Sequence, residues 1–75
     1  MRNNKVIVDI YYSGRNFSAC APLLPGCAAT GSTEKEVSQR IEEAIKLHVK
    51  SSLEDGDDIP AVFDGPYELI FLRNN

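Results

Sequence analysis

One amphipathic helical segment most constrains how this 75-residue chain can fold. Thr33 followed by Glu36 is a capping-box pattern, which begins a helix. Gly56 is a typical stop signal just beyond a helix end. We therefore expect a helix that Thr33 caps and that ends near Leu53 or Glu54. Its apolar face follows helical spacing and consists of Val37, Ile41, Ala44, Ile45 and Val49, with His48 in the same stripe.

The other apolar segments have the patterns of β-strands. Residues 5–12 alternate between a fully apolar face and a mixed face, which is typical of a strand that packs on one side. Tight turns at residues 13–16 and at Pro25-Gly26 separate this strand from two more. The expected strands are residues 5–12, 17–22, 27–30 and 67–72, with a loop at 55–66 and a tail at 73–75. The predicted fold is α+β, in the order β-β-β-α-β, with one helix packed on one face of the sheet.

Length and charge limit the function. A chain of 75 residues is expected to form a single domain, residues 1–75. The net charge is −3 and the eight basic residues are scattered, which argues against a nucleic-acid partner and fits a basic protein partner better. No segment approaches the roughly 20 apolar residues that span a bilayer. No signal-peptide pattern is visible either, so we expect a cytoplasmic protein without a membrane partner.

Residues 17–33 resemble the signature of the HicB antitoxin family. That signature is a strand, a Pro-x-Leu-Pro-Gly-Cys turn, a short strand and a Gly-x-Thr that opens a helix. The segments Glu43-Ala44-Ile45, Glu54-Asp55-Gly56 and Ile59-Pro60 also look like the family, so the resemblance covers nearly all of residues 5–60. The matching signature positions are Pro22, Leu24, Pro25, Gly26, Cys27, Gly31 and Thr33.

The resemblance implies a partial ribonuclease-H-like fold and a role as an antitoxin. In a HicB-type toxin–antitoxin system, the antitoxin binds a small basic HicA-type toxin that cleaves messenger RNA, and masks its active site. Many members carry an additional DNA-binding domain at the C-terminus. This chain stops three residues after its last predicted strand, so we expect no direct DNA binding from it.

Carboxylates could in principle make the chain an enzyme. A ribonuclease-H-like nuclease holds two Mg²⁺ ions with acids on a strand and a helix, and Asp9, Glu42 and Glu43 are the candidates. Adjacent helical residues point about 100° apart, however, so Glu42 and Glu43 cannot both face one metal. We interpret these acids as solvated surface groups and expect no catalytic residue. A metal-dependent nuclease remains a distant alternative.

Neither the histidine nor the cysteines form a convincing site. His48 has no further ligands at zinc spacing and lies in the apolar stripe, which favours a core or interface position. Cys20 and Cys27 lack Cys-x-x-Cys spacing, and we expect two unpaired, reduced cysteines that act as small apolar groups. No metal site and no cofactor are therefore expected.

The apolar strand faces predict self-association. One helix covers only one face of a sheet, yet Ile7, Tyr11, Tyr12 and residues 69–72 place apolar side chains on the second face as well. We expect a homodimer or a higher oligomer. The tyrosines could instead be half-buried at a strand end.

The loop before the last strand is the predicted contact with a toxin. Its acids can compete with the phosphates of RNA for a basic surface, and aromatic side chains often anchor protein interfaces. The predicted contact residues are Asp57, Asp58, Phe63, Asp64 and Tyr67. The alternative function is an orphan homo-oligomeric domain of the same fold with an unknown partner or ligand.

Overall fold

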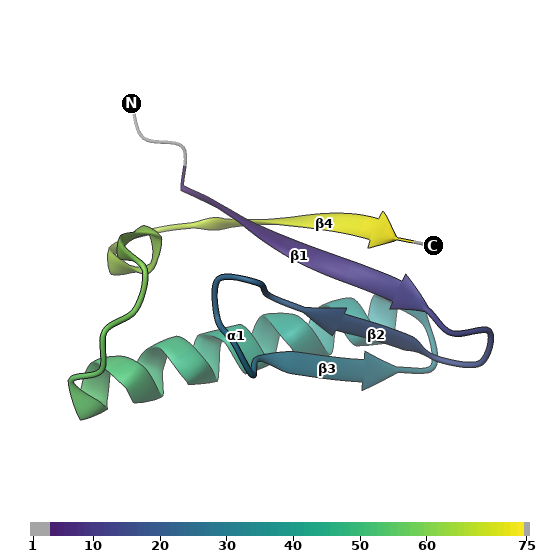
Figure 1. Cartoon of the computed structure of the whole chain (residues 1–75), viewed down its shortest axis with the longest axis horizontal. Coiled ribbons are helices and arrows are strands. Elements are labelled where there is room, and N and C mark those ends of the chain that lie inside the picture. The colour runs from purple at the N-terminus through teal and green to yellow at the C-terminus, as the bar shows by residue number, and fades with distance from the viewer. Residues whose placement is uncertain (1–3, 75) are drawn as a thin grey trace.

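The computed structural model describes residues 4–74 as a four-stranded sheet with one long helix on one face (Figure 1). The predicted α+β class and the order β-β-β-α-β are confirmed, with a 3₁₀ turn added before the last strand. The elements are β1 (Lys5–Tyr12), β2 (Phe17–Cys20), β3 (Ala28–Gly31), α1 (Glu34–Asp55), the 3₁₀ helix η1 (Ala61–Asp64) and β4 (Glu68–Asn74).

The sheet is mixed, with the strand order β3-β2-β1-β4. β1 is antiparallel to β2, with Ile10 opposite Ala19, and β2 is antiparallel to β3. β4 returns from the far end of the helix and pairs with β1 in parallel, from Lys5 opposite Glu68 to Tyr11 opposite Asn74. The first strand is therefore internal, and β3 and β4 are the two edges.

The core lies between α1 and the sheet. The apolar stripe of the helix buries Val37, Ile41 and Ile45 completely, as the spacing predicts. The small side chains of β2 and β3 let the helix approach closely. At Gly31 a Cβ atom would lie 2.8 Å from the backbone N of Val37, so a side chain would collide with the helix. The buried strand residues that face α1 include Val6, Val8, Ile10 and Ala19.

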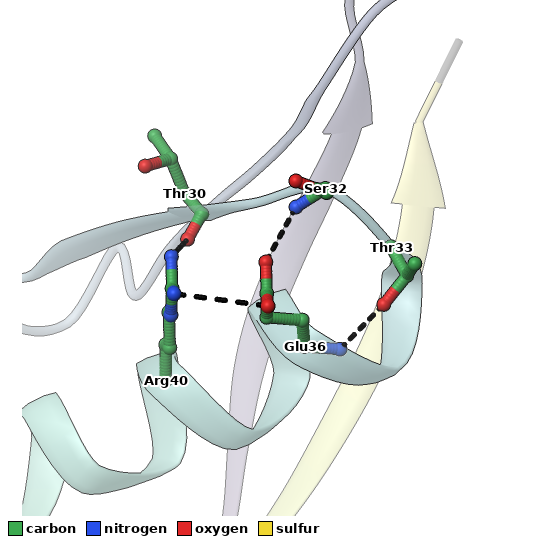
Figure 2. Close-up of polar contacts among 5 residues, drawn as sticks. All are labelled: Thr30, Ser32, Thr33, Glu36 and Arg40. Carbon is green, nitrogen blue, oxygen red and sulfur yellow. Dashed lines mark hydrogen bonds and ion pairs between the residues drawn. The ribbon is translucent and has the colours of Figure 1, made fainter.

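Both helix ends follow the predicted capping. The Glu36 N–H donates to Thr33 Oγ1 at 3.0 Å, and the Glu36 carboxylate accepts from the Ser32 N–H at 2.7 Å (Figure 2). The reciprocal bond of the box therefore reaches one residue further back than the pattern implies. Arg40 lies 3.7 Å from Glu36 and donates to the Thr30 carbonyl at 2.9 Å. Gly56, with φ of +74°, ends the helix at Asp55.

The motif between β2 and β3 is a structural turn. The Leu24 N–H donates to the Ala21 carbonyl and the Cys27 N–H to the Leu24 carbonyl, both at 2.9 Å. Leu24 and Cys27 are buried, and Gly26 adopts a positive φ of +88° that a side chain would disfavour. Because the turn uses the Cys27 amide, β3 begins at Ala28 rather than at the predicted residue 27.

The C-terminal third differs most from expectation. The predicted loop at residues 55–66 contains η1, which places Phe63 in the core with 4% of its side chain exposed. β4 begins one residue later and ends two residues later than predicted, because its pairing with β1 extends to Asn74. Arg73 and Asn74 therefore belong to the sheet and not to a tail. Asn75 lies outside the described residues.

Candidate protein-binding surface

A groove separates α1 from the edge strand β4. The helix packs mainly on β3 and β2 and leaves β4 uncovered at the far edge (Figure 1). The groove, called the β4 groove below, has a volume of about 520 Å³. Its lining mixes charged and apolar groups: Glu42, Lys46, Pro66, Tyr67, Glu68, Leu69 and Phe71. Sequence reasoning missed this groove, since it depends on where the helix lies over the sheet.

A second pocket lies at the other end of β4 on the same side of the sheet. It measures about 360 Å³, and we call it the β4 end pocket. Ile10, Glu34, Ser38, Phe71 and Arg73 line it. Phe71 lies at the middle of β4, lines both hollows and is 41% exposed. This phenylalanine is therefore the centre of an uncovered apolar strip.

The sheet face opposite the helix is also uncovered by the elements of residues 4–74. Ile7 and Leu72 lie on this open face with 38% and 45% of their side chains exposed, and Tyr11 is exposed beside them. At the end of β4 the Asn74 amide donates to the Asp9 carboxylate at 3.1 Å. Tyr12 alternates with Tyr11 along β1 and therefore lies on the helix side, where its ring centroid is 4.8 Å from that of Phe17, so its predicted place on this second face is wrong.

Acidic side chains concentrate in one stretch of the chain. Residues 51–72 hold six acids and no Lys, Arg or His, whereas the whole chain has a net charge of only −3. We call these residues the acidic segment. The predicted contact residues Asp57, Asp58 and Asp64 are all exposed in it. The Asp57 N–H donates to the Ser52 carbonyl at 2.8 Å, which holds the start of the loop against the helix end.

The two predicted aromatic anchors differ in position. Phe63 is buried, so its ring cannot be an exposed anchor, and the predicted contact role is corrected to a core role. Tyr67 is half-buried and lines the β4 groove. The ring centroids of Phe63 and Tyr67 are 5.1 Å apart in an edge-to-face arrangement, so the buried Phe63 ring packs against the ring of Tyr67. Burial, together with the nearby Glu42 carboxylate and Cys27, raises the pKa of the Tyr67 hydroxyl, which stays neutral and can donate a hydrogen bond.

The other candidate residues do not converge on a reactive site. Asp9 is on the open face, Glu42 lines the β4 groove, and Glu43 is exposed on α1. Within residues 4–74, no three His, Cys, Asp or Glu side chains are grouped so that they could hold a metal ion. His48 is half-buried on α1. No helix of the described part of the chain is long and apolar enough to cross a membrane.

Both cysteines have free thiols. Cys27 is buried under the motif turn, and this burial raises the pKa of its thiol. Cys20 is half-buried at the end of β2. A raised thiol pKa means little thiolate at neutral pH, so Cys27 is suited to packing rather than to nucleophilic chemistry.

Three comparisons relate the chain to known proteins. A family model described as "HicB_like antitoxin of bacterial toxin-antitoxin system" matches residues 5–64. A curated relative, UPF0150 protein ssr1765 of Synechocystis sp., is 36% identical over 58 residues, which are 77% of this chain and 72% of the relative. A chain in the solved "HicA3 and HicB3 toxin-antitoxin complex" superposes with a TM-score of 0.58 at 25% identity. The match covers 79% of this chain and 64% of that one, so it spans less than two thirds of the solved chain.

Proposed function

This chain belongs to the HicB-like antitoxin family of bacterial toxin–antitoxin systems, and from that premise we propose that it neutralises a small basic toxin that cleaves messenger RNA. It binds the toxin as a protein inhibitor and covers the active site. The observation that carries the contact surface is the acidic segment, with six acids and no basic residue over residues 51–72.

The charge of this segment matches what such a toxin must present. An enzyme that cleaves RNA needs a positive surface for the phosphate backbone. Exposed carboxylates at Asp57, Asp58 and Asp64 compete for that surface and accelerate the encounter. Tyr67 belongs to the acidic segment, lines the β4 groove and supplies an aromatic anchor with a hydroxyl donor. The same charge disfavours direct contact of this surface with DNA.

The proposed action is binding and not catalysis, and its place is the cytoplasm, where messenger RNA is translated. The dispersed positions of Asp9, Glu42 and Glu43 support the first part. We also propose that the chain self-associates, because apolar side chains are exposed on both faces of β4 at Phe71 and Leu72. An orphan domain that only self-associates is the second candidate function, and the same exposed strand favours it.

The test uses the short basic reading frame expected beside the gene of this chain. That product is expressed alone and together with this chain, and growth, messenger RNA cleavage and co-purification are measured. We expect growth arrest and RNA cleavage from the product alone, and rescue with a stable complex when both are present. If the neighbouring product is harmless, or toxic but unaffected and unbound by this chain, the antitoxin function is excluded and the orphan domain is favoured.

A matched pair of variants tests the contact surface. Asp57→Asn with Asp58→Asn removes two charges from the acidic segment, and Glu43→Gln removes one exposed charge from α1 as the control. Rescue should need a higher level of the first variant and the normal level of the second. Equal rescue by both would move the toxin contact away from the acidic segment without changing the antitoxin assignment.

A further inference from the structure

We propose that a second copy of this chain pairs with the outer edge of β4 in antiparallel fashion, so that two four-stranded sheets become one continuous sheet. This inference names the surface for the self-association proposed above and does not depend on the toxin. It rests on two observations, the unprotected edge of β4 and the central position of Phe71, and the charges at the two ends of the strand do not oppose it.

The two edges of the sheet are unequal. β3 has four residues, and the carbonyl of Thr30 already accepts a hydrogen bond from Arg40 (Figure 2). β4 has seven residues, pairs with β1 along one side, and has no strand on its other side among residues 4–74. Natural proteins usually protect a long edge strand with Pro, Lys or a bulge. The β4 sequence, ELIFLRN, contains neither Pro nor Lys and pairs with β1 residue for residue without a bulge.

The exposed side chains of β4 favour a partner that is apolar on both faces. Phe71 lies on the helix side, opposite Val8, with 41% of its surface exposed. Leu72 lies on the open face, opposite Asp9, and is exposed to a similar extent. A loop or a helix can cover one of these faces, whereas an extended strand alternates and covers both. β4 of a second copy is itself such a strand.

Symmetry places Phe71 on the two-fold axis. In an antiparallel pair, side chains directly opposite each other lie on the same face. A two-fold axis perpendicular to the sheet at the midpoint of β4 therefore sets Phe71 against Phe71 of the second copy. Ile70 then lies opposite Leu72 on the open face. Both helices remain on one side of the extended sheet.

The charges at the ends of β4 do not oppose this arrangement. The β4 groove at the start of the strand contains Glu42, Glu68 and Lys46, and the β4 end pocket contains Glu34 and Arg73. Antiparallel pairing brings the groove of each copy beside the end pocket of the other. Each hollow holds both signs of charge, so this pairing does not bring together two hollows that carry charges of one sign only.

The size of the contact sets the expected affinity. At about 3.3 Å per residue, the seven residues of β4 give an edge roughly 23 Å long. A sheet layer is about 10 Å deep, so the strand edge alone supplies well under the roughly 800 Å² per partner of a standard interface. The second copy must therefore also fill the β4 groove and the β4 end pocket beside Phe71. We therefore expect a dimer that dissociates in the micromolar range.

The experiment is a charge-swap rescue on the full chain, measured by sedimentation equilibrium from about 1 to 200 µM. Phe71→Glu and Phe71→Lys each place two like charges against each other on the axis, so each variant alone should dimerise at least about a hundredfold more weakly than the original chain. An equal mixture of the two variants pairs opposite charges and should recover the dimer. The control is Leu47→Glu on α1, where the leucine is 68% exposed, and it should dimerise normally.

A measurement on the unsubstituted chain tests the β4 contact even where the variants do not fold. Amide hydrogen exchange in β4 should slow with rising protein concentration at the outward N–H groups and stay constant in β3. A chain that is monomeric at 200 µM overturns both the self-association and its surface. A dimer that persists in Phe71→Glu, a variant mixture that stays monomeric, or β4 exchange without concentration dependence overturns the β4 surface alone.

Discussion

The guanidinium of Arg73 in β4 forms an ion pair with the carboxylate of Glu34 in the first turn of α1, with Arg73 Nε 2.7 Å from Glu34 Oε2. The two residues are 39 positions apart in the chain. The pair joins the uncovered edge strand to the start of the helix. It forms one wall of the β4 end pocket, where both residues line the hollow.

This ion pair is expected to contribute little to stability. Both side chains are largely exposed, so water and salt screen their attraction, and exposed pairs are worth about 0–1 kcal/mol. Arg73→Ala and Glu34→Gln should each lower the free energy of unfolding by less than about 1 kcal/mol. Urea denaturation of the two single variants and the double variant gives the coupling energy. A coupling above about 2 kcal/mol would mean that the pair is desolvated far more than its exposure implies.

Gly31 tests how closely β3 approaches the helix. A Cβ at this position would lie 2.8 Å from the Val37 backbone N, so Gly31→Ala must push the helix start away from the strand. We expect a loss of about 1–3 kcal/mol of unfolding free energy. Gly65→Ala is the matched control, because no atom lies within 4 Å of a Cβ built there and its φ of −143° suits any residue. Equal stability of the two variants in urea would show that the helix start yields without cost.

Phe63 should act through the core. Its ring is buried and contacts Tyr67, so Phe63→Ala leaves a cavity that costs about 3–5 kcal/mol. In a chain of this size that loss is a large part of the total stability, and the variant should be mostly unfolded at room temperature. Phe63→Leu keeps most of the apolar volume and should cost less than about 1.5 kcal/mol. Circular dichroism during urea titration measures both, and a fully stable Phe63→Ala would contradict the core role.

The kinetics of binding to the cognate toxin should distinguish the contribution of the acidic charges from that of the aromatic anchor. Asp57→Asn with Asp58→Asn should slow association and flatten its dependence on salt, since exposed rim charges act mainly on the encounter. Tyr67→Ala should instead speed dissociation by about tenfold or more, as expected for a buried anchor. Stopped-flow mixing at several salt concentrations resolves both rates. Glu43→Gln is the control, and unchanged rates in all three variants would place the contact on another surface.

Cys27 should make stability depend on alkaline pH. Burial raises the pKa of its thiol above the ordinary value of a cysteine, so the folded state favours the neutral form. Its contribution is complete below the pKa of the unfolded chain and is lost as pH rises through the pKa of the folded chain. The unfolding free energy should therefore fall above about pH 9, less so in Cys27→Ala, and Cys20→Ala should keep the full decline. Urea titrations from pH 7 to 10.5 measure this, and identical pH profiles in all three proteins would contradict it.

Local sequence determined the elements whose causes are local. The capping pair at Thr33 and Glu36, the helical stripe and the stop at Gly56 act within one or two turns, so the pattern located α1 to within two residues. The alternation of residues 5–12 matched β1 fully, because period two is a property of the strand itself. The motif likewise located the turn at Pro25 and Gly26, although Cys27, predicted as the first strand residue, belongs to the turn through its amide hydrogen bond to Leu24.

The candidate binding surface depended on contacts between residues far apart in the chain. The alternation of β4 could not say that it pairs with β1 in parallel, nor that this pairing extends to Asn74. Phe63 was expected in an acidic loop. Its ring is buried in the core because the structure has a 3₁₀ turn at this position. Local periodicity tells which side chains share a face, whereas their exposure depends on what the rest of the chain covers. The sequence by itself thus determined α1, β1 and the turn. The tertiary structure decided the uncovered β4 edge, because α1 packs mainly on β2 and β3 and no strand of residues 4–74 pairs with the outer side of β4.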